Sequence, residues 1–497
     1  MGWLALCCMC RAMCECPRFI NSGRDRRSAG VLLLLALSLS AAQLRAQPYA
    51  PSSTAVPPTL TTVSVPTVPL MTLREALTYA RLHQPELRSA RERFLAVAAD
   101  ARVPAAQWLP SAGATLQAVG STANNSTATI FSDNAVDLPR IGGTPIQSRP
   151  EWRPYATTLA AVGLRQELFD FGRIAAQTAA GEALIAIERD RLQATHLDIT
   201  FFVTQAYYAV KAARAVMEAA AQAEQRAQVH SDFANVGVKS GMRPPIEITR
   251  ATADLTRFTV GRIRAQGNLR IARSVLAAAV GFTEPELDSA QVQESVPPTP
   301  PLAQVERRAV AYQPEVLQAL DQRKAQHAQS IAISASLRPN LFATAAVSAR
   351  AGGAASNNNL TAEGRGLIPN VPNYDAGLIL AWPFYQPTVD ATASASRQRE
   401  WAFDAQIASA KQKALAAAQQ FYRRTRVAET AIEALAQATE AARANYEQAD
   451  ARFRAGLGTS TELADAEAIR LEAEVQEAVG GFELATARAQ LARVMGD

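Results

Sequence analysis

An internal duplication is the feature that most limits how this chain can fold. The tripeptide Gln-Pro-Glu at 84–86 recurs at 313–315, a shift of 229 residues, and Gly241 recurs as Gly456, a shift of 215 residues. The first copy has the longer loop, which absorbs the difference between the two shifts. Each copy is roughly 200 residues long, far more than a solenoid repeat of about 20–50 residues. The chain therefore reads as one duplicated domain and not as the roughly three globular domains that its length suggests.

Each copy shows the same order of elements, namely helix, strand, loop, strand, very long helix, turn and helix. Thr72 followed by Glu75 is the capping-box pattern that starts a helix. Good helix formers, above all Ala, Gln, Glu and Arg, fill the long segments. The expected helices are 72–108, 172–236 and 246–280 in the first repeat (72–282), and 302–337, 387–454 and 461–495 in the second repeat (302–497).

The first long helix carries a coiled-coil pattern. Its apolar residues recur every seven positions in two series, and the second series begins four residues after the first one ends. Assigned to the d and a positions of a heptad, the two series form a coiled-coil seam. At 1.5 Å per residue, about 65 residues make a rod of roughly 100 Å. The seam residues are Ile185, Leu192, Ile199, Val203, Val210 and Met217.

Four segments alternate strictly between apolar and polar or small residues. In the last of them, Tyr374, Leu378 and Leu380 share one face, whereas Asp375 and Gly377 share the other. Such alternation over about ten residues with aromatic residues at the ends is typical of a transmembrane β-strand, although a half-buried strand packed on helices produces it too. Gly- and Asn-rich loops, 120–155 and 350–373, join the members of each pair. The expected strands are 111–119, 158–168, 340–349 and 374–384.

Four strands are too few to make a membrane barrel. Bacterial barrels begin at about eight strands, and open strand edges are not tolerated in lipid. If the strands span a membrane, several protomers must contribute to one barrel. Three copies would supply twelve strands, which is enough to close around a lumen.

The beginning of the chain reads as a signal peptide, 1–46. Three arginines between residues 24 and 27 precede an apolar run at 31–39, and small residues follow, with cleavage expected after Ala42 or Ala46. The run is too short to span a bilayer, which takes about 20 residues. This segment holds all five cysteines, so no disulfide framework is expected elsewhere. It also holds six arginines against two acids, so most of the net charge of +5 belongs to it and gives no reason to expect nucleic acid as a partner.

Two proline-rich segments flank the first repeat. Residues 47–71 are expected to form an extended periplasmic tether, and residues 283–301 a linker between the two repeats.

With these features the chain resembles the TolC-like outer-membrane efflux proteins, also called outer membrane factors. The resemblance is carried by the duplicated order of elements, by Gln-Glu-Leu-Phe-Asp-Phe-Gly at 166–172, by the turns 240–242 and 455–457, and by Phe-Arg-Ala-Gly-Leu-Gly-Thr-Ser-Thr-Glu-Leu at 453–463. It covers nearly all of 72–497.

The resemblance implies a fold class that is mainly α with membrane β. Long α-helical coiled-coil hairpins and four transmembrane β-strands per protomer would form a homotrimer, with a 12-stranded β-barrel in the outer membrane joined to a 12-helix α-barrel in the periplasm. Segments 48–71 and 283–301 and the end of the chain would form an equatorial belt around this tunnel.

The implied function is a passive exit duct in outer-membrane lipid. It would serve a tripartite efflux system, as in drug resistance, or a type I secretion system, together with a periplasmic adaptor (membrane fusion) protein and an inner-membrane transporter. The alternative is a soluble periplasmic coiled-coil adaptor or scaffold, which would lack duplicated amphipathic strand pairs. No enzyme activity, cofactor or metal is expected. The sequence names neither the cargo nor the class of pump.

The resemblance also points to a periplasmic gate on the helix after the second turn. The gate carboxylates of the family match Glu462 and Asp465, which share one helix face, and a ring of such acids favours cations. The alternative is that Glu462 simply caps this helix, near whose N-terminus acids are stabilised. The acid of the closed-state link matches Glu247. Its basic partner matches Gly458, which cannot form an ion pair, so Arg243 or Arg250 is the candidate substitute.

Two further groups of residues follow from the resemblance. The two turns would be the tips on which the adaptor docks, although they are also ordinary glycine-containing helix–helix turns. Aromatic residues near the strand ends would form an interfacial belt, or else pack in the usual way. The turn residues are Ser240, Gly241, Met242, Ala455, Gly456 and Leu457, and the aromatic residues are Trp152, Tyr155, Trp382, Phe384 and Tyr385.

Overall fold

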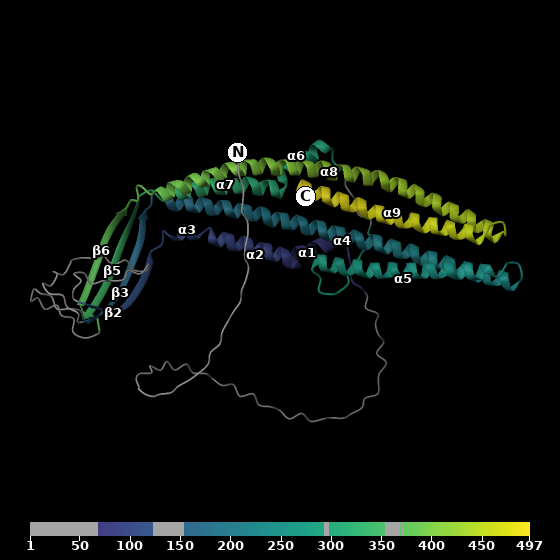
Figure 1. Ribbon diagram of the computed structural model, residues 1–497, viewed down its shortest axis with the longest axis horizontal. Helices are drawn as coiled ribbons and strands as arrows, with labels where there is room; N and C mark the ends of the chain where they lie inside the picture. The colour runs from purple at the N-terminus through teal and green to yellow at the C-terminus, as the bar shows by residue number, and fades with distance from the viewer. Residues whose placement is uncertain (1–67, 123–153, 293–297, 353–367, 370) are drawn as a thin grey trace, which may run out of the picture. The chain divides into compact units, whose positions relative to one another are not determined.

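The computed structural model describes residues 68–122, 154–292, 298–352, 368–369 and 371–497 (Figure 1). These residues belong to one compact unit, Pro66–Asp497. They form long helices and one four-stranded sheet, and the same elements occur in both repeats. The predicted class, mainly α with long helical hairpins, four strands and an internal duplication, is confirmed.

The expected helix 72–108 is wrong as a single element, because the structure divides it into three helices. These are α1 (Leu73–His83), α2 (Pro85–Asp100) and α3 (Val103–Ala106). The first break lies at Gln84, whose ψ of 119° is extended. A proline disfavours helical backbone in the residue before it, so Pro85 ends one helix and starts the next.

The second repeat breaks at the matching position. The expected helix 302–337 consists of α6 (Leu302–Tyr312) and α7 (Pro314–Ala335), and Gln313 between them has a ψ of 124°. The duplicated Gln-Pro-Glu tripeptide is therefore a duplicated helix break. The capping box at the start of α1 is confirmed, because Glu75 N donates to Thr72 Oγ1 and Thr72 N donates to Glu75 Oε2.

Four long helices make two antiparallel hairpins. The first hairpin pairs α4 (Arg173–Lys239) with α5 (Ile246–Val280), and the second pairs α8 (Pro387–Arg454) with α9 (Ser460–Met495). The strands lie at one end of α4 and α8, and the hairpin turns lie at the other end (Figure 1). The 67 residues of α4 correspond to about 100 Å of helix.

The sheet has the strand order β2–β3–β5–β6, and every pair in it is antiparallel. Its last strand is shorter at the C-terminal end than the expected 374–384, because it stops before Pro383, which has no N–H for the ladder. The strands are β2 (Ser111–Thr122), β3 (Pro154–Phe169), β5 (Asn340–Gly352) and β6 (Val371–Ala381).

The register gives this sheet one continuous apolar face. Ala114 pairs with Val162, Val162 with Val347, and Val347 with Tyr374, so these side chains form a row across all four strands. Val162, Val347 and Tyr374 are exposed in a single chain. Successive residues of a strand point to opposite faces, so Gly163 and Asp375 lie on the other face. The alternation seen in the sequence thus becomes one apolar surface shared by both repeats.

A tight corner connects the sheet to α4. Phe171 and Gly172 both have positive φ, and the buried Asp170 carboxylate accepts from the backbone N–H groups of Gly172 and Ile174. The carboxylate therefore satisfies N–H groups at the start of α4 that have no partner within the helix. Arg338 Nη1 from the second repeat donates to Phe171 O at 2.8 Å.

The two proline-rich segments meet in a short strand pair. In this pair β1 (Leu70–Met71) runs parallel to β4 (Asp288–Ser289). The expected tether, 47–71, and the expected linker, 283–301, therefore contribute one strand each. Asp288 is buried and its carboxylate accepts from Arg214 on α4 and Arg273 on α5.

The largest apolar cluster lies where α1, α4 and α5 meet, close to this strand pair. Tyr207, Leu276 and Leu287 are fully buried in it. The second repeat has a smaller cluster around Val305 and Leu491. Within the described ranges, no helix combines the length and the apolar character that crossing a membrane would need.

Candidate functional site at the hairpin turns

Both hairpin turns have the same backbone geometry. Gly241 and Gly456 adopt φ of 73° and 74°, the left-handed conformation that favours glycine. Met242 N donates to Gly237 O and Leu457 N donates to Arg452 O, as in Schellman motifs. The residue after each glycine therefore points away from the helices, and Met242 is 78% exposed and Leu457 76% exposed.

Glu462 and Asp465 lie on the exposed side of the first turns of α9. Leu463 and Ala466, which alternate with them, are buried. The helix begins with Thr459 as its N-cap, whose Oγ1 accepts from Glu462 N at 3.2 Å. The Glu462 carboxylate does not return to the cap but lies 3.5 Å from Arg452 Nε. The capping interaction thus uses the backbone of Glu462 and leaves its carboxylate accessible to solvent.

Glu247 is not brought together with these two acids. Its side chain is largely buried at the start of α5, where its Oε1 accepts from Ser460 Oγ at 3.1 Å. Arg243 and Arg250, the two candidate substitutes for a basic residue at position 458, lie 3.7 Å and 3.8 Å from its carboxylate. Both arginines belong to the same repeat as Glu247, so the direct link from Glu247 to the second repeat comes from the Ser460 hydroxyl.

Arg243 makes a second link between the repeats. Its Nη2 donates to Phe453 O at 3.1 Å, and its guanidinium lies 3.9 Å from the centre of the Phe453 ring. Gly237 provides the space, because a Cβ there would lie 2.8 Å from Arg243 Cδ. The sequence pointed to Arg243 only as a partner of Glu247 and missed Phe453 and Ser460. The only signal in the sequence was the pair of consecutive prolines after Arg243, which restricts the backbone of this turn and so marks it as a rigid segment.

A small cavity of about 40 Å³ lies between the two hairpins, next to Glu247, Phe453 and Ser460. Residues of α4, α5, α8 and α9 line it, among them His230, Glu247, Phe258 and Glu467. Burial lowers the pKa of His230, so its imidazole is uncharged at neutral pH. In the part of the chain that the structure describes, no group of three His, Cys, Asp or Glu side chains is arranged to hold a metal ion.

The expected aromatic belt is partly described. Trp382 and Phe384 follow β6, are exposed, and meet edge to face with ring centres 6.2 Å apart. Tyr385 beside them is exposed too. Tyr155 lies in β3 opposite Ser121 of β2. Trp152 lies outside the described residues.

Comparison with known proteins places these features in a family context. The profile of the family described as outer membrane efflux protein matches residues 76–282. No curated protein matches the chain. The resemblance inferred from the sequence is confirmed by this match together with the fold of the structures below.

Three solved structures of outer-membrane proteins share the fold at low identity. The CmeC outer membrane channel of Campylobacter jejuni has a TM-score of 0.67 and 13% identity, with 85% of either chain covered. The outer membrane protein VceC of Vibrio cholerae has a TM-score of 0.63 and 17% identity, and the match covers 85% of this chain and 96% of VceC. The open state of the MtrE outer membrane channel of Neisseria gonorrhoeae has a TM-score of 0.64 and 17% identity, and the match covers 85% of this chain and 88% of MtrE.

Proposed function

Because this chain resembles the TolC-like outer membrane efflux proteins and has the fold of solved outer-membrane channels, we propose that it is an outer-membrane channel assembled from three copies. The observation that carries the proposal is the four-stranded sheet. Among the described strands, β2 and β6 have one neighbour each, and the apolar face crosses all four strands. Open edges are costly in lipid, so twelve strands from three copies would close the barrel.

The protein purified from outer membranes tests this assembly. We expect it to need detergent, to have the mass of three chains, and to conduct ions in planar bilayers. A monomer that is soluble without detergent would contradict the proposal and would favour the alternative, a periplasmic adaptor or scaffold.

We propose that Glu462, Asp465 and Glu247 serve the periplasmic gate in two different ways. The exposed pair Glu462 and Asp465 would form a ring of six carboxylates in three copies, which favours cations. Glu247 would hold the two hairpins together through Ser460 in the closed state. Replacing both exposed acids by alanine should reduce cation selectivity and block by divalent ions, whereas Glu472→Ala, an exposed acid farther along α9, should change neither. Unchanged selectivity in the double variant would refute the ring.

The two turns are proposed as the docking tips for a periplasmic adaptor that connects the channel to an inner-membrane transporter. Met242 and Leu457 support this role, because both are apolar and project at the ends of the hairpins. Ser240, Gly241, Ala455 and Gly456 provide the backbone that presents them. Met242→Ser with Leu457→Ser should abolish cross-linking to the adaptor and leave conductance in bilayers unchanged. Retained cross-linking in this variant would refute the docking role.

Trp382, Phe384 and Tyr385 are proposed to lie at a membrane interface, together with Trp152 and Tyr155. Exposed aromatic side chains at the end of an apolar strand face suit the boundary between lipid and water. Fluorescence quenching by brominated lipids tests the position of Trp382. We expect strong quenching by lipids brominated near the headgroup and weak quenching by lipids brominated at the chain ends.

A further inference from the structure

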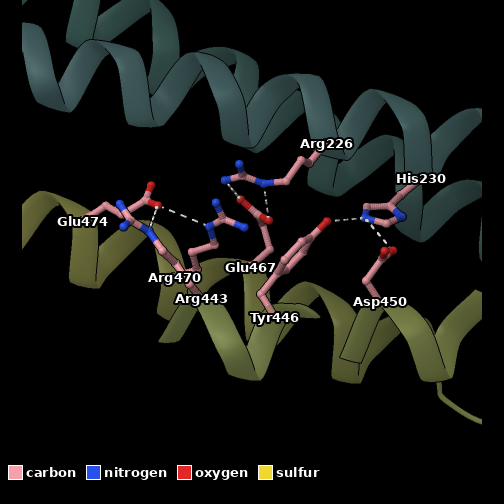
Figure 2. A network of polar contacts seen from close by, with 8 residues as sticks. All are labelled: Arg226, His230, Arg443, Tyr446, Asp450, Glu467, Arg470 and Glu474. Carbon is pink, nitrogen blue, oxygen red and sulfur yellow. Dashed lines mark hydrogen bonds and ion pairs between the residues drawn. The ribbon is translucent and has the colours of Figure 1, made fainter. Parts of the chain in front are cut away.

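A buried polar cluster joins the two hairpins beyond the gate residues (Figure 2). At its centre Arg226 of α4 binds Glu467 of α9 with two hydrogen bonds, from Nε to Oε2 at 2.8 Å and from Nη2 to Oε1 at 2.7 Å. Glu467 is only 2% exposed. The two residues are 241 positions apart and belong to different repeats. We call this pair the clamp.

Tyr446, His230 and Arg470 lie beside the clamp. The Tyr446 ring of α8 lies 5.4 Å from the Arg226 guanidinium and 5.1 Å from that of Arg470, and its hydroxyl lies 3.1 Å from His230 Nε2 (Figure 2). Burial raises the pKa of Tyr446 to about 12 and lowers that of His230. Both groups are therefore uncharged at neutral pH, and the Glu467 side chain of the ion pair is almost fully buried.

A second carboxylate extends the cluster along the α8–α9 hairpin. Glu474 Oε1 accepts from Arg443 Nε of α8 at 3.1 Å and from Arg470 Nε of α9 at 3.2 Å. The clamp thus connects α4 to a hairpin whose own two helices are held together by charge. Separating α4 from α9 at this level would leave buried charges without partners, which is strongly unfavourable.

The duplicated positions show that only one of the two equivalent helix–helix contacts carries these charges. The shift of 215 residues puts Ala441 at the position of Arg226 and Thr252 at that of Glu467. Neither residue can form an ion pair. Asp450, whose carboxylate lies 4.0 Å from His230 Nε2, also belongs to the cluster. The remaining charged members likewise have uncharged counterparts, namely Gln228 for Arg443, Asn235 for Asp450, Leu255 for Arg470 and Thr259 for Glu474.

In a ring of copies, this difference between the repeats distinguishes the contact within one chain from the equivalent contact between neighbouring copies. The clamp joins α4 to α9 within one chain, and the counterpart contact would join α8 of one copy to α5 of the next. Ala441 and Thr252 would then face each other where the clamp stands within the chain. This ion pair can therefore join the hairpins of one chain but has no equivalent at the counterpart position between copies.

Between the clamp and the turns, the described contacts that join the two repeats are hydrogen bonds and ring contacts, with no second buried Arg–Glu pair between the repeats. On α9 this stretch runs from Ser460 to Glu467, about two helical turns or roughly 10 Å. Ser460 of α9 donates to Glu247, Arg243 Nη2 donates to Phe453 O at 3.1 Å, and the cavity of about 40 Å³ interrupts the packing. Glu247 Oε2 is buried there without a hydrogen-bond partner. Water can replace these contacts when the tips separate.

Resting on the channel function proposed above, we propose that the clamp is the fixed pivot of the gate. When the channel opens, the hairpin tips between the clamp and the turns move apart, whereas α4 and α9 stay in contact at the clamp and beyond it. The pivot limits the movement within each chain to the last two turns of helix, and any wider dilation takes place between copies.

Paired cysteines on either side of the clamp test the pivot. Outside residues 7–16 the chain has no cysteine, so introduced pairs are unambiguous. Ala223→Cys with Leu471→Cys lies beyond the clamp, where both parent side chains belong to one packed cluster. Glu247→Cys with Ser460→Cys lies on the tip side, where the parent side chains are in contact. The readout is voltage-driven opening in planar bilayers in KCl, before and after oxidation and again after reduction.

We expect the disulfide beyond the clamp to leave the openings unchanged and the disulfide at the tips to abolish them until it is reduced. Closure by the disulfide beyond the clamp would overturn the proposal, and so would normal opening with the tips linked. If the unmodified protein does not conduct at all, the channel function itself is refuted, which is a different result from a failed pivot.

Charge substitutions give a second test that needs no disulfide. Glu467→Gln leaves Arg226 without its counter-charge, so separation should extend beyond the clamp and the leak current without partner proteins should rise. Replacing both residues by methionine keeps an apolar contact and removes both charges, which is often nearly neutral. This double variant should keep the leak of the parent. A leak in the double variant as large as in Glu467→Gln, or none in either, would contradict the pivot.

Discussion

Replacing Asp288 by asparagine tests how the β1–β4 pair is held to the long helices. The side chain is 5% exposed, and its carboxylate accepts from Arg214 and, at 2.5 Å, from Arg273 Nη2. Asparagine keeps the shape but leaves two arginines beside a neutral amide. Removing one partner of a buried ion pair costs about 3–5 kcal/mol, and the partial exposure of both arginines puts this case at about 3 kcal/mol. At 1.4 kcal/mol per factor of ten, this is about 100-fold in the equilibrium for local opening.

Amide hydrogen exchange measured by mass spectrometry on peptides around residue 289 gives this equilibrium directly. Asp288 N donates to Pro69 O at 2.9 Å and Ala290 N donates to Met71 O at 2.8 Å, so both amides exchange only when the strand pair opens. We expect these amides to exchange about 100-fold faster in Asp288→Asn.

Glu286→Gln is the matched control, because Glu286 contacts the same Arg273 at 3.9 Å but is about one third exposed. Exposed ion pairs contribute about 0–1 kcal/mol, so exchange should rise by less than about fivefold. The reasoning is refuted if Asp288→Asn accelerates exchange no more than Glu286→Gln does. It is also refuted if the amides of α5 accelerate equally, since the effect would then be global.

Three smaller perturbations test other parts of the structure. Thr459→Ala removes the acceptor for Glu462 N and should weaken the start of α9 by about 1 kcal/mol, seen as faster amide exchange in its first turn only. Gly181→Ala should lower the melting temperature, because its Cβ would lie 3.0 Å from the backbone of Ala101, whereas Gly267→Ala, with open space, should raise it. Burial raises the pKa of Asp190 to about 6, so the protonated form is favoured and its stabilising contribution, complete below about pH 4, is lost as pH rises through 6. Asp190→Asn should therefore raise the melting temperature at pH 7.5 and not at pH 4, and an equal rise at both values would contradict the assignment.

Local patterns predicted the elements well where the responsible residues are neighbours. The capping box at Thr72 formed as expected because its two partners are three residues apart. The faces of the four strands followed from their alternation, since successive residues of a strand point to opposite sides. The helix breaks before Pro85 and Pro314 were missed even though the restriction before proline is local, because the apolar pattern continues on both sides.

The candidate site was predicted less completely. The resemblance grouped Glu247 with Glu462 and Asp465, but the structure buries Glu247 against Ser460 and leaves the other two acids exposed. Which hydroxyl or guanidinium reaches Glu247 depends on the rotation of α5 against α9. That rotation is set by packing between helices of different repeats.

What the sequence by itself determined is the duplicated order of helices and strands, the apolar face of each strand and the resemblance to outer membrane efflux proteins. These depend on periodicity and on short motifs, which neighbouring residues encode. Only the tertiary structure decided that Arg226 meets Glu467, that Arg243 meets Phe453 and that β1 pairs with β4. Each of these contacts joins residues more than 200 positions apart, so it exists only once the hairpins have packed and water has left the space between them.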